Sequence, residues 1–325
     1  MTTSESIMYI THNNHLQFGW GNGTSNFDNK FGEFWVKYGR ASYIPLSFKD
    51  ECIRAAKLIG ESTKKPILVF FSGGIDSEIM VRSFIESGVE FETVVMKYKY
   101  RHDDHINENE TKRTFEIAIE HDLVCHTITV DVEEFFKNRL PELCRRYKTN
   151  SWSKLLVTEI IRQFSNYHCV IGGGEMSLQR HKTNGRRGLT GLYLEEELVN
   201  IAAIEVANDV GTTVSNRFYM YTPELMLSWL TDPMVSHWIK YENALNSKYT
   251  NLNYYGIKTY MMYKHWPTMS IRPKVSGLER MMLQLNRDLE VNEDIRLFFE
   301  NINLYKRTEF IINHPTLLDW LSPVI

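Results

Sequence analysis

Six consecutive residues, 72–77 with the sequence Ser-Gly-Gly-Ile-Asp-Ser, combine the residue types that bind phosphate groups. The two glycines let the backbone turn sharply and approach an anion without a Cβ atom in the way. Backbone N–H groups in such a turn, together with the N-terminus of a following helix, attract phosphate oxygens. The two serine hydroxyls add donors, and the carboxylate of Asp76 can hold a magnesium ion that bridges phosphates. The segment is therefore predicted to be a phosphate-binding loop.

The local context of this segment favours a phosphate site over a plain turn. The apolar residues 67–71 predict a buried strand directly before it, and apolar residues at helical spacing predict a helix over 77–87, closed by Gly88. The alternative is an ordinary helix-capping turn, in which Ser, Gly and Asp are common. A strand–turn–helix context is the setting that phosphate-binding motifs require. A Walker-type site is not supported, because the sequence lacks Gly-x4-Gly-Lys followed by Ser or Thr.

Three further polar stretches have two or more interpretations. Arg272 and Lys274 flank a proline in the turn at 270–277, and they are either phosphate contacts or an ordinary solvated pair. The basic loop at 179–188 is a lid over a nucleotide, a contact for a nucleic-acid partner, or a solvated loop. Residues 102–105, His-Asp-Asp-His, have metal-compatible types but no further ligand at a diagnostic spacing, which favours a polar loop over a metal site.

The elements that must position these residues alternate in type. Ser47 begins a predicted helix that ends at Gly60. Strands are then predicted at 67–71, 92–98, 124–130 and 168–171, and helices at 77–87, 107–121 and 152–164. This order predicts a doubly wound α/β fold with about four parallel strands and right-handed crossovers. In such folds ligands bind beyond the carboxyl ends of the strands, where both 72–77 and the Gly-Gly-Gly-Glu segment at 172–175 are expected.

The two ends of the chain have less regular sequence patterns than the α/β part. Residues 1–45, rich in Gly, Asn and aromatics, predict turns and a short hairpin. After the basic loop the chain is predicted to be mainly helical, with helices at 193–208, from Pro223 after the N-cap Thr222, at 234–244 and at 278–289. The predicted domains are an N-terminal extension at 1–46, an α/β nucleotide-binding domain at 47–191 and a helical substrate-side region at 192–325.

The composition excludes several classes of protein. With 43% hydrophobic residues among 325, the chain can bury a substantial core, and its formal net charge of −3 gives no overall attraction to nucleic acid or anionic membranes. The four cysteines form no Cys-x-x-Cys pair and no zinc spacing, which favours reduced thiols and a cytoplasmic protein. The sequence has neither a signal peptide nor an apolar stretch of membrane-spanning length, so no membrane partner is expected. The oligomeric state has no signature in the sequence.

Residues 72–77 resemble the Ser-Gly-Gly-x-Asp-Ser signature of the PP-loop ATP pyrophosphatases. The likeness extends loosely over about residues 47–280 to the synthetase domain of asparagine synthetases, through 109–118, 172–175 and 221–225. It implies an adenine nucleotide alpha-hydrolase-like fold of the HUP type, with ATP and Mg²⁺ bound. Unlike those synthetases, the chain has too little sequence before Ser72 for a glutaminase domain, so glutamine hydrolysis is not expected.

The resemblance also implies roles for individual residues. Asp76 and Glu175 would hold Mg²⁺, and Lys274 would contact the pyrophosphate group, so these three are the implied catalytic residues. The implied ATP contacts are Ser72, Gly73, Gly74, Ile75, Asp76, Ser77, Gly173 and Arg272.

The implied reaction has two steps. A substrate oxygen from a carboxylate, amide or carbonyl attacks the α-phosphorus and releases pyrophosphate, and an amine or ammonia then displaces AMP. Nitrogen transfer is favoured over sulfur transfer because no cysteine follows Cys169. Two alternatives stay open: an ATP-dependent enzyme that modifies a nucleobase in tRNA or DNA and docks through 179–188, and a non-catalytic nucleotide sensor.

Overall fold

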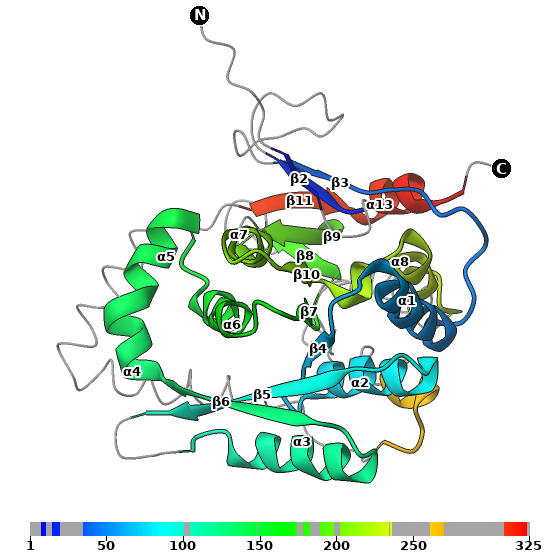
Figure 1. Ribbon diagram of the computed structural model, residues 1–325. Helices are drawn as coiled ribbons and strands as arrows, with labels where there is room; N and C mark the ends of the chain where they lie inside the picture. The colour runs from blue at the N-terminus through cyan, green and yellow to red at the C-terminus, as the bar shows by residue number, and fades with distance from the viewer. Residues whose placement is uncertain are drawn as a thin grey trace, which may run out of the picture.

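A computed structural model describes most of the chain between residues 35 and 233, together with shorter segments at both ends (Figure 1). The described residues are 8–10, 15–19, 35–100, 105–147, 149–173, 178–182, 189–197, 202–233, 235, 261–269 and 309–323. None of the helices within these ranges has the length and apolar character needed to cross a bilayer.

The centre of the fold is a five-stranded, all-parallel sheet with the strand order β10-β7-β4-β5-β6. Figure 1 shows helices on both sides of this sheet, with α3 below β5 and β6 and α6 above them. The predicted doubly wound parallel α/β fold is therefore confirmed. Its strands are β4 (Ile67–Phe70), β5 (Glu92–Lys99), β6 (Cys125–Asp131), β7 (His168–Val170) and β10 (Thr213–Ser215).

The fifth strand, β10, exceeds the predicted number of about four and follows the predicted domain boundary at residue 191. It is three residues long, which is too short to show a periodic pattern, and it is held by parallel pairing with β7. The buried histidine of β7, His168, reaches β10 through both ring nitrogens, 2.7 Å from Thr213 Oγ1 and 2.9 Å from Ser215 Oγ. Polar side chains thus help to hold a strand that hydropathy does not reveal.

Most helices of the α/β part begin and end within two residues of their predicted bounds. A helical stretch between β6 and α6 is absent from the predictions, although its apolar side chains are buried in the core. The helices that agree are α1 (Phe48–Ser62), α2 (Ile75–Ser87), α3 (Glu108–Glu120) and α6 (Trp152–Gln163). The additional stretch consists of α4 (Val132–Glu134), the π-helical turn η1 (Phe135–Arg139) and α5 (Leu140–Tyr147).

A second sheet corrects the prediction of a helix over 193–208. Residues of this range up to Glu197 belong to strand β9, and the helix α7 (Ala202–Asp209) covers only the end of the range. β9 pairs with a neighbour on each side, one of them more than a hundred residues away, so tertiary pairing overrides local preference. The predicted basic loop is shortened as well, because its residues up to Lys182 lie in β8. The antiparallel strands are β8 (Leu178–Lys182), β9 (Leu189–Glu197) and β11 (Glu309–Asn313).

The rest of the C-terminal region is partly described. Helix α8 (Pro223–Leu230) begins as predicted, because the Thr222 side chain accepts a hydrogen bond from the amide of Leu225 at 3.1 Å. The helices predicted at 234–244 and 278–289 lie outside the described residues, except for Val235, which is buried. Residues 261–265 are helical, and α13 (His314–Leu321) follows β11.

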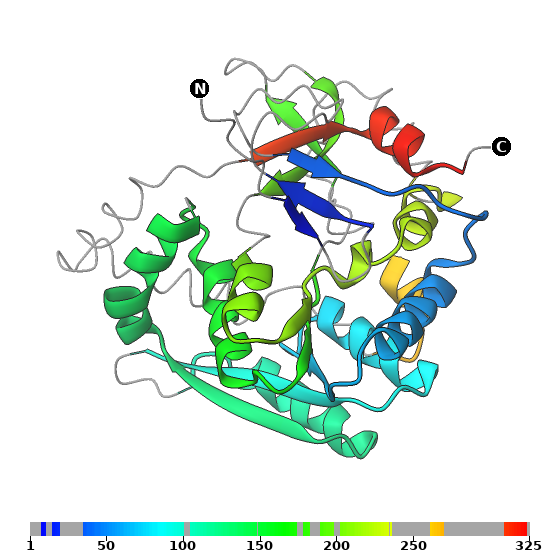
Figure 2. The ribbon, with the colours of Figure 1, turned by 45° about the horizontal axis from the view of Figure 1, so that its top comes forward.

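The N-terminal segment docks beside the C-terminal elements. The strands β1 (Met8–Ile10), β2 (Gln17–Gly19) and β3 (Trp35–Lys37) form an antiparallel sheet, in agreement with the predicted hairpin. Figure 2 shows this sheet close to β11 and α13. The amide of Ala41 donates to the carbonyl of Leu321 at 2.7 Å, and the ring of Tyr38 stacks on that of Trp320. The two ends of the chain therefore stabilise each other.

Acid is expected to destabilise this docking through His15. Burial lowers the pKa of its ring from 6.5 to about 3, and the neutral ring accepts a hydrogen bond from the Gly39 amide at 2.8 Å. At pH values between 3 and 6.5, His15 is protonated in the unfolded chain but neutral in the folded protein. The free energy of unfolding should therefore fall by about 1.4 kcal/mol per pH unit below pH 6.5. Urea unfolding between pH 7 and 4.5 measures this, and equal slopes for wild type and His15→Gln would contradict it.

Candidate active site

The loop between β4 and α2 has a backbone conformation that requires glycine. Gly73 has a φ of +77°, and a Cβ atom added there would lie 2.1 Å from the carbonyl oxygen of Glu110 in α3. An L side chain is disfavoured at that φ, and a backbone carbonyl cannot swing aside as a long side chain can. Gly74 is the N-cap of α2, so the helix begins at Ile75, two residues earlier than predicted. The sharp turn predicted from the two glycines is therefore present.

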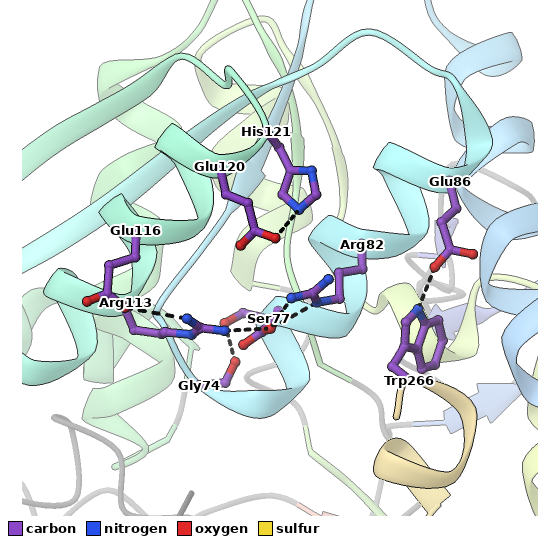
Figure 3. Close-up of polar contacts among 10 residues, drawn as sticks. Gly74, Ser77, Arg82, Glu86, Arg113, Glu116, Glu120, His121 and Trp266 are labelled. Atoms are coloured by element: carbon purple, nitrogen blue, oxygen red, sulfur yellow. Dashed lines mark hydrogen bonds and ion pairs between the residues drawn. The ribbon is translucent and has the colours of Figure 1, made fainter. Parts of the chain in front are cut away.

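The two serines of this loop close it with hydrogen bonds. Ser77 Oγ donates to the carbonyl oxygen of Gly74 at 3.0 Å (Figure 3). Since a hydroxyl has one proton, Ser72 is then the donor in the 3.0 Å contact between the two hydroxyl oxygens. Ser77 is buried and Ser72 is exposed. Ser77 therefore stabilises the loop, whereas Ser72 is the hydroxyl that a ligand can reach.

The loop lies at the point where the strand order of the sheet reverses direction. From β4 the chain runs outward through β5 to β6, and then returns to the other side of β4 to form β7 and β10. In open parallel sheets the crevice at such a switch point, beyond the carboxyl ends of the strands, is where ligands bind. The loop follows the carboxyl end of β4, so it lies beside this switch point.

The glycines after β7 lie on the other side of the switch point. A Cβ atom at Gly172 would lie 3.3 Å from Met80 Cε and 3.9 Å from Ser77 Cα, so the two predicted segments are adjacent in space. Gly173 follows at the same edge, and its carbonyl accepts from the amide of Tyr219. The fold thus brings together Gly173 and residues 72–77, which are nearly a hundred residues apart in the sequence.

Helix α3 supports the loop through contacts that sequence reasoning missed. The carboxylate of Glu78 is fully buried in the first turns of α2, and it pairs with Arg82 at 2.9 Å and with Arg113 of α3 at 3.4 Å. Figure 3 shows the two guanidinium groups converging near the start of α2. The Thr114 hydroxyl adds a hydrogen bond to the carbonyl of Phe71 at 3.3 Å. Glu78 and Arg82 are spaced i, i+4 and could have been paired from the sequence, but nothing in the sequence indicated Arg113.

Of the predicted polar loop at 102–105, only His105 lies among the described residues, shortly after the end of β5. Asn107 is buried and connects to the end of β5, accepting from the Tyr98 amide at 2.9 Å and donating to the Met96 carbonyl at 2.7 Å. His105 lies 2.8 Å from the hydroxyl of Thr111 in α3. Across the described parts of the chain, no three His, Cys, Asp or Glu side chains are grouped as a metal site would need.

The other predicted site residues lie outside the described residues. These are Glu175, Arg272 and Lys274, and in the basic loop residues 183–188. Asp76 is described: it is the second residue of α2 and is partly exposed, with its Oδ1 atom buried. A carboxylate in the first turn of a helix interacts favourably with the positive end of the helix dipole.

The cysteines show no sign of nucleophilic chemistry. All four are free thiols, and three of them, Cys52, Cys144 and Cys169, are buried. Burial raises the pKa of Cys144 and of Cys169 to about 12, so both stay protonated near neutral pH. A thiolate is the reactive form of cysteine, and these two side chains therefore act as small apolar residues of the core.

Comparison with known proteins gives likenesses in structure alone. No family model and no curated protein sequence matches the chain. An NH3-dependent NAD synthetase from Campylobacter jejuni aligns over 70% of this chain and 97% of its own, with 8% identity and a TM-score of 0.33. An NMN synthetase from Francisella tularensis aligns over 75% and 95%, with 13% identity and a TM-score of 0.29. The U34-tRNA thiolase NcsA from Methanococcus maripaludis aligns over 79% and 78%, with 8% identity and a TM-score of 0.32. These likenesses concern the fold alone.

Proposed function

We propose that this chain is an ATP pyrophosphatase that adenylylates an acceptor oxygen, releases pyrophosphate and then transfers nitrogen to the acceptor, as an asparagine synthetase-like amide ligase. The observation that carries the proposal is the turn at Gly73, where the backbone of Glu110 leaves no room for a side chain and only glycine fits. That turn leads into a helix N-terminus beside the switch point of the sheet, a setting suited to phosphate groups. The likeness of residues 72–77 to the PP-loop signature supports ATP as the source of those phosphates.

In this proposal the loop binds the pyrophosphate end of ATP. The amides of the glycine turn and the exposed hydroxyl of Ser72 donate to phosphate oxygens, and the first amides of α2 add the positive end of the helix dipole. The Asp76 carboxylate, assisted by Glu175, would hold Mg²⁺, which neutralises charge on the phosphates when it is bound. Glu175 follows Gly173 by two residues in the sequence.

Lys274 is proposed as the cation that contacts the departing pyrophosphate, together with Arg272. It follows Met269 by five residues, a length of chain that spans at most about 18 Å. The indole N–H of Trp266, three residues before Met269, donates to Glu86 at 2.9 Å near the end of α2 (Figure 3). Glu86 follows Ile75 by eleven residues in α2, which corresponds to a rise of about 16.5 Å. The connection is therefore long enough for Lys274 to approach the loop.

The proposed chemistry needs positioning more than covalent help from the protein. The acceptor oxygen attacks the α-phosphorus, a new P–O bond forms and the bond to the β,γ-pyrophosphate breaks. An amine or ammonia then attacks the activated acceptor carbon, and AMP departs with the former acceptor oxygen. Fixed N–H donors and cations stabilise the charge that develops on pyrophosphate, which is the largest contribution expected from such a site.

Pyrophosphate release tests this function. Purified protein with ATP–Mg²⁺ would be assayed against a panel of carboxylates, each with ammonia or an amine, and against tRNA and DNA. Pyrophosphate and AMP should form in equal amounts with the correct acceptor. If that acceptor is a carboxylate labelled with ¹⁸O, one labelled oxygen should appear in AMP. Formation of ADP and phosphate in place of AMP would contradict the proposal.

The same panel decides between the two alternatives. A nucleotide sensor should bind ATP but release no pyrophosphate with any acceptor. A nucleobase-modifying enzyme should require tRNA or DNA, and its nucleic-acid affinity should fall with salt and with neutralisation of the basic loop. The cations to replace for that purpose are Arg180, Lys182, Arg186 and Arg187.

A further inference from the structure

One tyrosine contacts the segments on both sides of the switch point. Tyr219 lies in the short 3₁₀ helix η3 (Phe218–Met220), which follows β10. Its hydroxyl donates to the carbonyl oxygen of Asp76 at 2.5 Å, in the first turn of α2. Its amide donates to the carbonyl oxygen of Gly173 at 3.3 Å, in the segment after β7. A single residue therefore contacts both segments that the proposed ATP site requires.

The ring of Tyr219 is held so that its hydroxyl has little freedom. The residue is only 2% exposed. The ring stacks on Phe48 of α1 at a centroid distance of 6.0 Å and an interplanar angle of 18°, and Phe218 meets it edge-on at 5.2 Å. Because the aromatic ring is rigid and packed on two sides, a shift of η3 would move the hydroxyl and, with it, the first turn of α2. The hydrogen bond to Asp76 is therefore a spacer of fixed length and not an adaptable surface contact.

We propose that Tyr219 is a positioning residue, which sets the distance between the phosphate-binding loop and the segment after β7. The inference rests on the proposed function. The carbonyl of Asp76 belongs to the same turn as the amides and the carboxylate that would bind phosphate and Mg²⁺, so a shift of this turn moves all of them together. Catalysis by positioning is sensitive to such shifts, because displacements of about 1 Å can cost roughly 100-fold in rate.

A matched control exists two residues further along the chain. Tyr221 is also buried, at 6% exposure, and its side chain is hydrogen-bonded to Ser62 at the end of α1, before β4 begins. Tyr219→Phe and Tyr221→Phe each remove one hydroxyl and one hydrogen bond from the same segment, while both rings remain. The two variants should therefore lose similar amounts of stability and melt within a few degrees of each other.

The expected result is a difference in catalysis without a difference in folding. Tyr219→Phe should lower kcat for pyrophosphate release by about tenfold or more, with a change of less than about threefold in the KM for ATP. Tyr221→Phe should stay within about twofold of wild type in both. In the nucleotide-free protein, amide hydrogen exchange in the first turns of α2 should be faster in Tyr219→Phe and unchanged in Tyr221→Phe.

Two results separate a failure of this inference from a failure of the proposed function. If wild type releases pyrophosphate, but the two variants share the same kcat and the same exchange in α2, Tyr219 is an ordinary core residue and the inference is overturned. If wild type neither binds ATP nor releases pyrophosphate, the proposed function is overturned. The exchange measurement needs no nucleotide, so it decides even then whether Tyr219 fixes the first turn of α2.

Discussion

Asp76→Asn is expected to lower the rate of pyrophosphate release by roughly 100- to 1000-fold, the loss typical of removing one electrostatic stabiliser from an active site. The amide side chain has nearly the same shape as the carboxylate but lacks the charge that would hold Mg²⁺. The position is the second residue of α2, where a negative charge contributes only about 0.3 to 1 kcal/mol through the helix dipole. Steady-state pyrophosphate release and urea unfolding of the variant should therefore separate a catalytic loss from a loss of fold.

Asp50→Asn is the matched control for this change. Asp50 occupies the first turn of α1, where its amide donates to the N-cap Ser47 at 3.2 Å, so it shares the helix-end environment of Asp76. Its replacement should cost a similar amount of stability and leave pyrophosphate release unchanged. Raising Mg²⁺ should restore part of the activity of Asp76→Asn, since a weaker site fills at higher concentration. Full activity of Asp76→Asn at low Mg²⁺ would remove Asp76 from the mechanism.

The sequence predicts the elements whose signals are local. Strand β4 is apolar at every position and fully buried, and α2 ends at the predicted Gly88, whose φ of +72° is the left-handed conformation of a helix C-cap. Both signals lie within a few residues of the element that they define. Helix α2 begins two residues before its predicted start, because its N-cap is Gly74, which has no side chain that could indicate a cap.

Strand β9 shows what local signals cannot supply. Its residues 193–197 have the composition of a helix, with Leu and three consecutive Glu, yet they pair with β8 on one side and with β11 on the other. The preference of a segment for strand depends on the neighbours that it finds in the fold. One neighbour, β11, begins at Glu309, and no pattern near residue 193 reports its presence.

The candidate site also has a part that the sequence indicates and a part that it does not. The loop at 72–77 could be singled out in the sequence because its proposed function depends on residue types, two glycines and an acid at fixed spacing. Its supports could not, because they are a backbone carbonyl, that of Glu110, and a tyrosine hydroxyl, that of Tyr219, which meets another carbonyl. A carbonyl exists at every residue and has no signature in the sequence. The contacts that hold the loop thus become visible only once the sheet has brought α3 and η3 beside it.

Gly73→Ala is expected to damage both the stability of the protein and its affinity for ATP. A non-glycine residue in the left-handed region costs about 1 kcal/mol or more. The added methyl group would also lie 2.1 Å from the carbonyl oxygen and 2.7 Å from the carbonyl carbon of Glu110, so the loop or α3 must move. Overpacking of this kind typically costs about 1 to 3 kcal/mol more. Urea unfolding and equilibrium binding of ATP–Mg²⁺ measure the two effects, and the affinity should fall by about tenfold or more.

Gly88→Ala isolates the part of this cost that comes from the backbone alone. Gly88 has nearly the same φ, +72°, but a Cβ atom there would meet no atom within 4 Å. Its replacement should therefore cost about 1 kcal/mol and leave ATP binding intact. If Gly73→Ala and Gly88→Ala are equally stable and bind ATP equally well, the close approach of α3 has no bearing on the loop. The proposed phosphate site at Gly73 would then lose its support, because it depends on a turn that only glycine can form against the backbone of α3.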